Sequence, residues 1–530
     1  MKISNLYSVL KCAVWALVLV GSVGCTKNFE DYNKLDDEPG FEQIPSPIRT
    51  GLAIQSMTFS VIPLIKNQYQ ISENMLGGAY GRYFAYAQAN KWTDTFLYYN
   101  VREEWHNAVF SNTMTNVYAN WSKVREITNG EGLSYAWAQI VRIAAVHRLT
   151  DIFGPMPYSK MGQGTGIVTE YDSQELVYHS MLEDLDNAIA EISSLVAVNP
   201  ADRSMKAYDY IYEGDFEKWL KFANSLKLRL AMRLTYVEPE LAKQKAEEAV
   251  ANPFGLINNN KDNAAIAVMQ TGDKNPLRWL VQDYSDCTSA AEIVTYMKSF
   301  NDPRISMYFN YTPSKEDFVG QRVGAPSSSY WSRYYSLPIV KTEDRVMWMN
   351  AAEVAFLRAE MAMRNWDAGD TAENLYKQGI HLSFEQWGAD MSLYDAYVAD
   401  NSSKPMNYIA HSSYYNYNAK SQMTVAWDEA ASDEAKLEKI ITQKWIAIYP
   451  LGTEAWTEQR RTGYPYFYPT LTNKSSEPSL NEHGAYRIPF PPSEALRNPE
   501  HYAKAVELLN GPDQYSTRLW WDAKQNKPQW

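Results

Sequence analysis

Two stretches of this chain combine aromatic rings with hydrogen-bonding side chains, which is the combination that binds carbohydrate. A sugar ring has an apolar face of C–H groups that an aromatic ring can cover. Its rim of hydroxyls pairs with amides, carboxylates and guanidinium groups. The stretches span residues 90–107 and 327–335. From them we expect a ligand to contact Trp92, Asp94, Tyr98, Tyr99, Asn100, Tyr330, Trp331, Arg333 and Tyr334.

The alternative for any of these rings is packing between helices. In the second stretch, four aromatic residues fall within positions 330–335, directly after a Gly-Ala-Pro-Ser-Ser-Ser turn. A turn of that composition favours an exposed loop. A weaker candidate set lies further along the chain and consists of Tyr408, Tyr414, Tyr415 and Tyr417.

The other reactive side chains form no recognisable catalytic or metal-binding motif. The chain has no nucleophile elbow, P-loop or glycine-rich dinucleotide fingerprint. Without these motifs we expect no cofactor and no catalysis. No two histidines have the i, i+4 spacing of a zinc-binding helix, so we also expect no metal. The 62 acidic residues leave one alternative open, a glycoside hydrolase that uses two carboxylates. The histidines are His106, His147, His179, His381, His411, His483 and His501.

The N-terminus predicts export. Lys2 and Lys11 flank a short polar start, and an apolar run follows at residues 12–20. The run is shorter than the roughly 20 apolar residues that span a bilayer, and it fits a secretory signal peptide. Small residues then lead into Cys25, as in the cleavage and lipidation site of a bacterial lipoprotein.

We therefore expect residues 1–24 to be a lipoprotein signal peptide and Cys25 to carry acyl chains. A plain signal peptide ending near Cys25 is the alternative, because Ser22 stands where such sites usually have Leu. Acidic residues and prolines make residues 25–47 a flexible tether. The body of the protein is then residues 48–530.

The composition of the chain limits the classes of partner and of covalent cross-link that we expect. The chain has 530 residues, 45% of them hydrophobic, and a formal net charge of −12. Cleavage before Cys25 would remove two lysines and no acid, which gives −14. An acidic surface argues against a nucleic-acid partner. The processed chain would keep Cys287 as its only free thiol, so no disulfide is expected.

Beyond the tether, the dominant hydrophobic period is helical. Tyr178, Leu182, Leu185, Ile189 and Ile192 step by four and three, which marks one face of a helix. Asp172 is the expected start of that helix, and Asn350 with Glu353 is expected to cap another. Further helices are predicted at 137–152, 219–234 and 437–448. Long connections at 162–171, 195–215, 258–286, 313–344 and 400–433 complete a mainly α protein of helix pairs.

Five segments, in order, resemble the SusD/RagB family of outer-membrane lipoproteins. They contain the sequences RLTDIFGPMPY at 148–158, WLKFANSLKLRLAMR at 219–233 and EVAFLRAE at 353–360. The helix after Tyr171-Asp172 and a C-terminal signature at 441–465 complete the resemblance. It covers the chain from Cys25 to its end.

The resemblance implies a fold of tetratricopeptide-like helix pairs with loop-rich elaborations. It also implies a non-catalytic, lipid-anchored protein on the outer face of the outer membrane. The implied partner is a SusC-type TonB-dependent transporter, over which the protein would sit as a lid. The implied cargo is an oligosaccharide, or in some members a peptide. Besides the glycoside hydrolase, a scaffold that binds only protein remains an alternative.

Charged residues within the helical motifs have a structural interpretation. Arg229 and Arg233 lie one turn apart, and Glu353 and Glu360 flank Arg358. We expect these residues to form ion pairs that line the core and fix helix register. The same interpretation applies to Glu454, Arg460 and Arg461.

Overall fold

The computed structural model describes residues 44–86, 93–162, 169–314, 316–325 and 332–528. The chain divides into two units, Met1–Arg49 and Thr50–Trp530. Cys25 and the expected signal peptide lie outside the described residues, as do Trp92, Tyr330 and Trp331.

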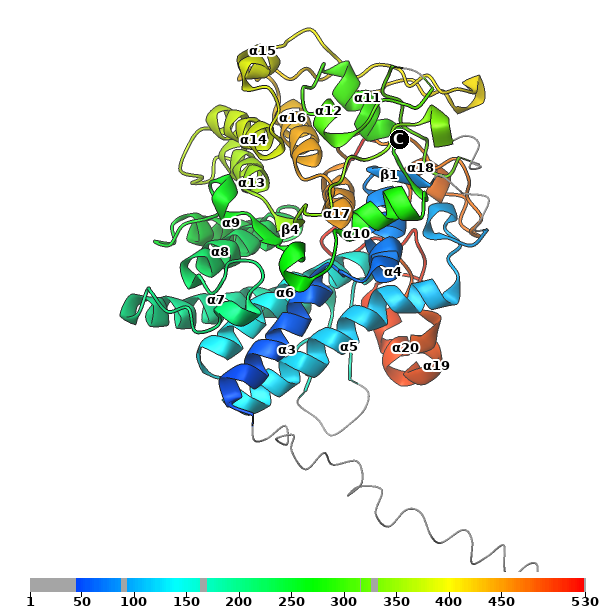
Figure 1. The fold of residues 1–530 in the computed structure, drawn as a ribbon. Helices are drawn as coiled ribbons and strands as arrows, with labels where there is room; N and C mark the ends of the chain where they lie inside the picture. The colour runs from blue at the N-terminus through cyan, green and yellow to red at the C-terminus, as the bar shows by residue number, and fades with distance from the viewer. Residues whose placement is uncertain (1–43, 87–92, 163–168, 315, 326–331, 529–530) are drawn as a thin grey trace, which may run out of the picture. The chain divides into compact units, whose positions relative to one another are not determined.

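The second unit is built mainly from helices joined by long loops (Figure 1). The helices are α3 (Ser46–Val61, which begins in the first unit), α4 (Lys66–Tyr69), α5 (Glu103–Thr128), α6 (Gly132–Phe153), α7 (Gln174–Val198), α8 (Phe216–Arg233), α9 (Pro239–Val250), α10 (Pro276–Arg278), α11 (Ala291–Ser299), α12 (Ile305–Tyr308), α13 (Ala351–Met363), α14 (Ala372–Trp387), α15 (Tyr394–Val398), α16 (Asp433–Ala447), α17 (Gly452–Thr462), α18 (Leu480–His483), α19 (Pro492–Arg497) and α20 (Pro499–Leu508).

Strands are short among the described residues. Strand β1 (Phe84–Tyr86) pairs antiparallel with β3 (Cys287–Ser289), and β2 (Ala264–Ile266) pairs antiparallel with β4 (Val346–Met349). These two ribbons join loop segments that are far apart in the sequence. This strand pairing therefore holds the loops against the helical body.

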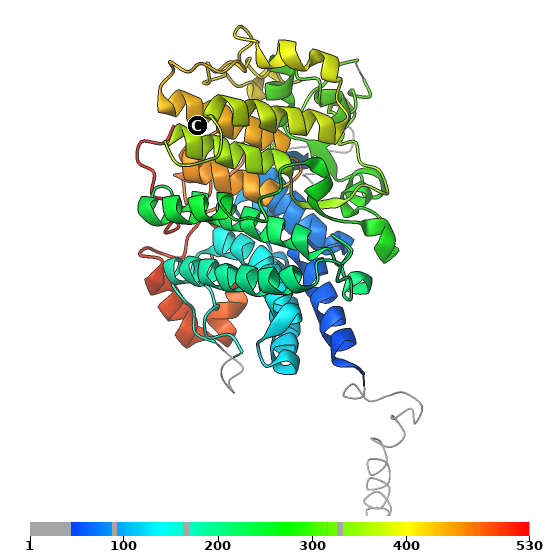
Figure 2. The ribbon, with the colours of Figure 1, turned by 90° about the vertical axis from the view of Figure 1, so that its left-hand side faces the viewer.

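Successive helices pack against one another from α5 to α9, and the stack continues through α13, α14 and α16 (Figure 2). The connection between α5 and α6 is only three residues long, so these two helices must run antiparallel. The apolar face predicted around Tyr178 and Leu185 is buried, as is Leu226 of α8. The predicted arrangement of helix pairs with loop-rich additions is confirmed.

Of the two helix caps predicted from the sequence, Asn350 is confirmed and Asp172 is wrong. The Asn350 side chain accepts a hydrogen bond from the backbone N–H of Glu353 at 2.9 Å, as expected. The cap of α7 is Ser173, whose hydroxyl accepts from Leu176, and not Asp172. The Asp172 carboxylate instead accepts the backbone N–H groups of Tyr158 and Ser159, which tie down the loop after α6.

One helical run among the described residues, Ser46–Gly78, is long and apolar enough to cross a membrane. Of its apolar stretch, 56% is buried within the protein. That degree of burial is typical of a core helix, and the run includes the buried residues Ile54, Met57 and Leu76.

Ion pairs lie at the centre of the helix stack. Arg229 of α8 pairs with Glu353 of α13 at 2.7 Å, and Arg233 pairs with Glu454 of α17 at 2.7 Å. All four side chains are buried. The expectation that these residues line the core is confirmed.

The same network extends along α17. Arg461 binds Glu360 of α13 at 2.6 Å and Glu458 at 2.8 Å. Burial alone would raise the pKa of Glu454, but the cations of Arg233, Lys444 and Arg229 lower it to about 2. Cationic neighbours also lower the pKa of Glu360 and Glu458 against the effect of burial, so these carboxylates stay ionised. Helices α8, α13, α16 and α17 each contribute charged side chains to the network.

Candidate ligand-binding site

A cleft of about 320 Å³ lies between α11 and two loop segments. Helix α11 contributes Val294, Thr295 and Lys298 to one wall. Residues 317–320 form a second wall and residues 406–411 a third. Tyr334, one of the residues expected to contact a ligand, lies at the cleft.

The Tyr334 ring stacks on the imidazole of His411, with ring centroids 4.4 Å apart and planes inclined by 26°. The Arg333 guanidinium donates to the Tyr334 hydroxyl at 3.2 Å. Arg333 and His411 are exposed, and Tyr334 is half-buried. The three side chains place a flat aromatic pair beside a hydrogen-bonding cation at the edge of the cleft.

Polar groups line the rest of the cleft. The Lys298 ammonium pairs with Asp317 at 2.6 Å, and the Asp317 carboxylate also accepts the backbone N–H of Phe318. Asn407 contributes an amide beside them. A hydroxyl-rich ligand would find donors and an acceptor within one cleft.

The wall formed by residues 406–411 is part of a small hairpin in which Tyr408 and Tyr417 pair antiparallel. The buried Tyr408 hydroxyl donates to the carbonyl of Gly320 at 2.7 Å. Burial raises the pKa of Tyr408 well above its usual range, so this hydroxyl keeps its proton. At Gly320 a Cβ atom would lie 2.1 Å from the carbonyl oxygen of Ala290, so the close approach to α11 requires glycine.

Tyr414 and Tyr415, the other members of the weaker candidate set, lie at the turn of this hairpin. Tyr414 is 82% exposed, and its ring contacts Tyr415 edge-on at 5.2 Å. The Arg322 guanidinium donates to the carbonyl of Tyr415 at 3.0 Å, which holds the turn to the segment before residue 326. Tyr414 therefore offers an exposed ring close in sequence to the cleft.

The first predicted stretch is placed differently from the expectation. Tyr98 and Tyr99 are buried, 5% and 4% exposed. The Tyr99 ring packs against Tyr80 and Tyr515 with centroids 5.8 Å and 5.9 Å away, and its hydroxyl bonds to Thr470. The expectation that these two rings form an exposed stacking surface is corrected, because tertiary packing encloses them.

The polar residues of the first stretch remain near the surface. Asn100 is exposed and donates to the half-buried Asp94 carboxylate at 3.1 Å. Thr95 caps the short helix that follows, and Tyr99 ends it in the left-handed conformation. Asp94 and Asn100 thus close a tight loop over the buried tyrosines.

The first predicted stretch and the segment just before the second are both hydrogen-bonded to residues 470–474. The backbone N–H of Leu471 donates to the carbonyl of Val323 at 3.2 Å, shortly before the second stretch. The N–H of Lys474 donates to the carbonyl of Tyr98 at 2.9 Å in the first. One backbone segment therefore binds two loops that are more than 200 residues apart in the sequence.

Comparison with known proteins identifies the fold. A family model described as SusD-like, "Susd and RagB outer membrane lipoprotein", matches residues 31–522. The chain belongs to the SusD/RagB family. The resemblance inferred from the sequence motifs is therefore confirmed. No similar sequence was found among curated proteins.

Solved structures of SusD homologues superimpose along nearly the whole chain. A SusD homologue from Bacteroides uniformis ATCC 8492 is 39% identical, with a TM-score of 0.83 over 90% of this chain and 99% of that one. A chitin-binding SusD homologue from Flavobacterium johnsoniae is 35% identical, with a TM-score of 0.84 over 91% and 99%. A SusD-like protein from Bacteroides thetaiotaomicron VPI-5482 is 32% identical, with a TM-score of 0.84 over 91% and 100%.

The sequence did not indicate that His411, Lys298 and Asp317 line the cleft beside Tyr334. The signal for His411 was available, because it lies between Tyr408 and Tyr414 in the weaker aromatic set. Lys298 and Asp317 carried no signal, since each is one charged residue on an ordinary helix or loop and only the fold brings them within 2.6 Å.

Proposed function

We propose that this protein is a non-catalytic, lipid-anchored binding protein on the outer face of the outer membrane. It binds oligosaccharide and delivers it to a SusC-type TonB-dependent transporter. The observation that carries the proposal is the Tyr334–His411 stack beside a cleft lined with Lys298, Asp317 and Asn407. A sugar ring needs both a flat apolar partner and groups that pair with its hydroxyls.

The lining of the cleft favours binding over hydrolysis. Hydrolysis of a glycosidic bond uses two carboxylates that face the same bond. Among the described residues that line the cleft, Asp317 is the only acid, and it is paired with Lys298. A chitin-binding relative with 35% identity over nearly the full chain supports a glycan as the ligand.

The test is binding of a panel of oligosaccharides to protein lacking residues 1–25, measured by isothermal titration calorimetry. Tyr334→Ala should weaken binding about two- to tenfold, because an aromatic contact contributes about 0.5–1.5 kcal/mol beyond its buried area. Tyr502→Ala is the matched control, since Tyr502 is also half-buried but lies on α20, away from the cleft. Equal affinity for both variants would exclude this cleft as the site.

Two further measurements separate the proposal from its alternatives. A glycoside hydrolase would release reducing sugar from the same panel, and one Asp or Glu substitution would abolish the release. A peptide-binding member of the family would bind peptides and no glycan. Full-length protein extracted from outer membranes should co-purify with a TonB-dependent barrel, and a failure to do so would remove the delivery role while leaving glycan binding intact.

A further inference from the structure

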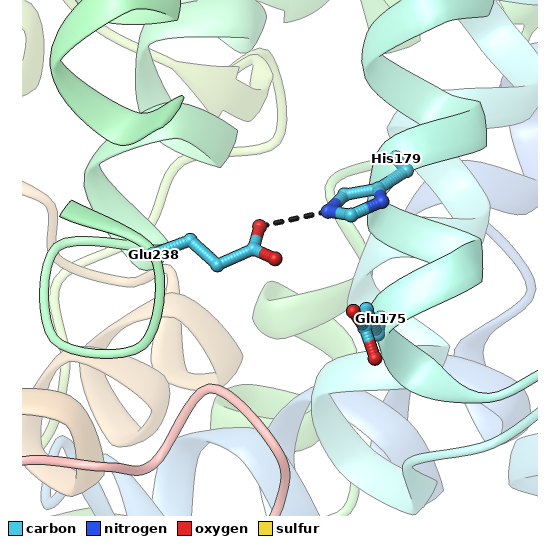
Figure 3. Close-up of side chains that lie close together, drawn as sticks. All are labelled: Glu175, His179 and Glu238. Atoms are coloured by element: carbon cyan, nitrogen blue, oxygen red, sulfur yellow. Dashed lines mark hydrogen bonds and ion pairs between the residues drawn. The ribbon is translucent and has the colours of Figure 1, made fainter. Parts of the chain in front are cut away.

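Three side chains that could bind a metal meet on the face of α7, far along the chain from the ligand cleft (Figure 3). Glu175 and His179 lie one turn apart on α7, and Glu238 lies just before α9. The His179 Nε2 atom is 2.7 Å from a carboxylate oxygen of Glu238. One possible ligand atom from each residue lies within 4.8 Å of the other two.

The cluster holds two carboxylates without a fixed cation. Among the described residues, the only ionic partner of Glu238 is His179, and Glu175 pairs with no lysine or arginine. Two carboxylates this close repel each other. Elsewhere on the same helix, Asp184 and Asp186 are each paired with buried Arg or Lys side chains. Within the described ranges, the Glu175–Glu238 pair therefore lacks the lysine or arginine partner that Asp184 and Asp186 have.

We propose that Glu175, His179 and Glu238 form a zinc-binding site. One imidazole nitrogen with two carboxylate oxygens is a ligand set that Zn²⁺ accepts, and the two carboxylates balance its charge. Tetrahedral Zn²⁺ places neighbouring N and O ligands about 3.4 Å apart. The ligand atoms reach that spacing by side-chain rotation, with the His179–Glu238 contact opening by about 0.7 Å. Water takes the fourth position, because Glu175 is exposed.

The metal would link two helical segments of the stack. It would join α7 to the turn between α8 and α9, the two sides of α8 in the helix stack. The His179 ring also meets Trp520 of the C-terminal segment edge-on, with centroids 6.2 Å apart. Glu175 and Trp520 both line a cleft of about 760 Å³. Zinc would therefore fix one rim of that cleft and stabilise the folded state by mass action.

The proposed site differs from the expectation of no metal. That expectation came from a search for two histidines at i, i+4 spacing. Here the helix supplies Glu175 and His179 at that spacing, and the third ligand, Glu238, is 59 residues beyond His179. Only the tertiary fold brings Glu238 close to the two residues of α7.

The test uses full-length protein stripped with a chelator and then titrated with ZnCl₂, CaCl₂ or MgCl₂ in a calorimeter. We expect one Zn²⁺ per chain, no comparable binding of Ca²⁺ or Mg²⁺, and a melting temperature that rises with zinc. His179→Ala should weaken zinc binding at least about tenfold, the loss that even a second-shell partner can cause. Glu175→Gln, an exposed change that should not disturb folding, should also weaken it.

His381→Ala is the matched control. His381 and Glu385 have the same i, i+4 spacing on α14 and similar exposure, with 3.8 Å between them. Zinc binding that persists unchanged in both His179→Ala and Glu175→Gln would overturn the proposal, as would equal losses in His381→Ala. An anomalous zinc peak elsewhere in a crystal would overturn it too. None of these measurements depends on glycan binding, so the zinc site can be refuted without refuting the proposed function, and the reverse also holds.

Discussion

His147 should make the stability of this protein depend on pH, and the structure gives the size of the effect. The residue is 2% exposed within α6, and its Nδ1–H donates to the carbonyl of Ile143 at 2.9 Å. Its other nitrogen, Nε2, faces the Arg229 guanidinium at 3.5 Å. Burial, and then the charge of Arg229, lower the pKa of His147 from 6.5 to about 3.

The sign follows from which state binds the proton. Between pH 6.5 and 3, the His147 side chain is protonated in the unfolded chain and neutral in the folded protein. Stability is therefore full above pH 6.5 and falls as pH drops toward 3. At pH 4.5, two pH units below the unfolded value, the loss is about 3 kcal/mol, since each unit corresponds to about 1.4 kcal/mol.

The assay is urea unfolding of the wild type and of His147→Gln at pH 7.5 and 4.5. The wild type should lose about 3 kcal/mol more than the variant over this range. Other groups act equally in both proteins and cancel. One of these is Asp151, whose pKa burial raises to about 6, an effect of opposite sign.

His381→Gln, at a half-buried surface position of α14, serves as the control and should follow the wild type. Equal losses of unfolding free energy in the wild type and in His147→Gln between the two pH values would contradict a neutral, buried His147. That result would mean that His147 is protonated in the fold or lies in contact with water.

Three substitutions test the core and the predicted loop. Leu226→Ala, at a fully buried position of α8, should lower the free energy of unfolding by about 2–5 kcal/mol in urea, and a loss under about 1 kcal/mol would mean that this face is not core. Arg461→Ala should cost about 3–5 kcal/mol by the same assay, because Glu360 and Glu458 lose their shared partner, and a near-neutral result would contradict the ionic core. Trp331→Ala should weaken oligosaccharide binding in calorimetry with little change in melting temperature, because loop stacking is local; a large fall in melting temperature would mark Trp331 as core.

The helices could be predicted because their signals are local. The four-and-three spacing around Tyr178 and the cap at Asn350 act within one helix, so the sequence carries them in full. The assignment of Asp172 as a cap was wrong for the opposite reason. Its carboxylate is used by Tyr158 and Ser159, which lie in the preceding loop, and such a contact depends on how two segments fold together.

The candidate site could be predicted only in part. Tyr98, Tyr99 and Tyr334 all lie in stretches that combine aromatic and polar residues, yet the first two are buried and the third borders a cleft. What separates them is tertiary packing, such as the Tyr515 ring against Tyr99. Aromatic residues serve cores and sugar sites alike, so composition cannot distinguish the two uses.

The residues that mark the family and those that would recognise a ligand lie on different parts of the fold. Arg229, Arg233 and Glu454 belong to the family motifs and are buried in the ionic network, where losing one leaves an uncompensated charge. Tyr334 and His411 lie on loop segments, where a substitution disturbs only local contacts. Stability therefore constrains the motifs far more strongly than it constrains the cleft. It follows that 39% identity to a relative predicts the helix stack well, whereas the choice of oligosaccharide must be determined from the loop residues of this chain.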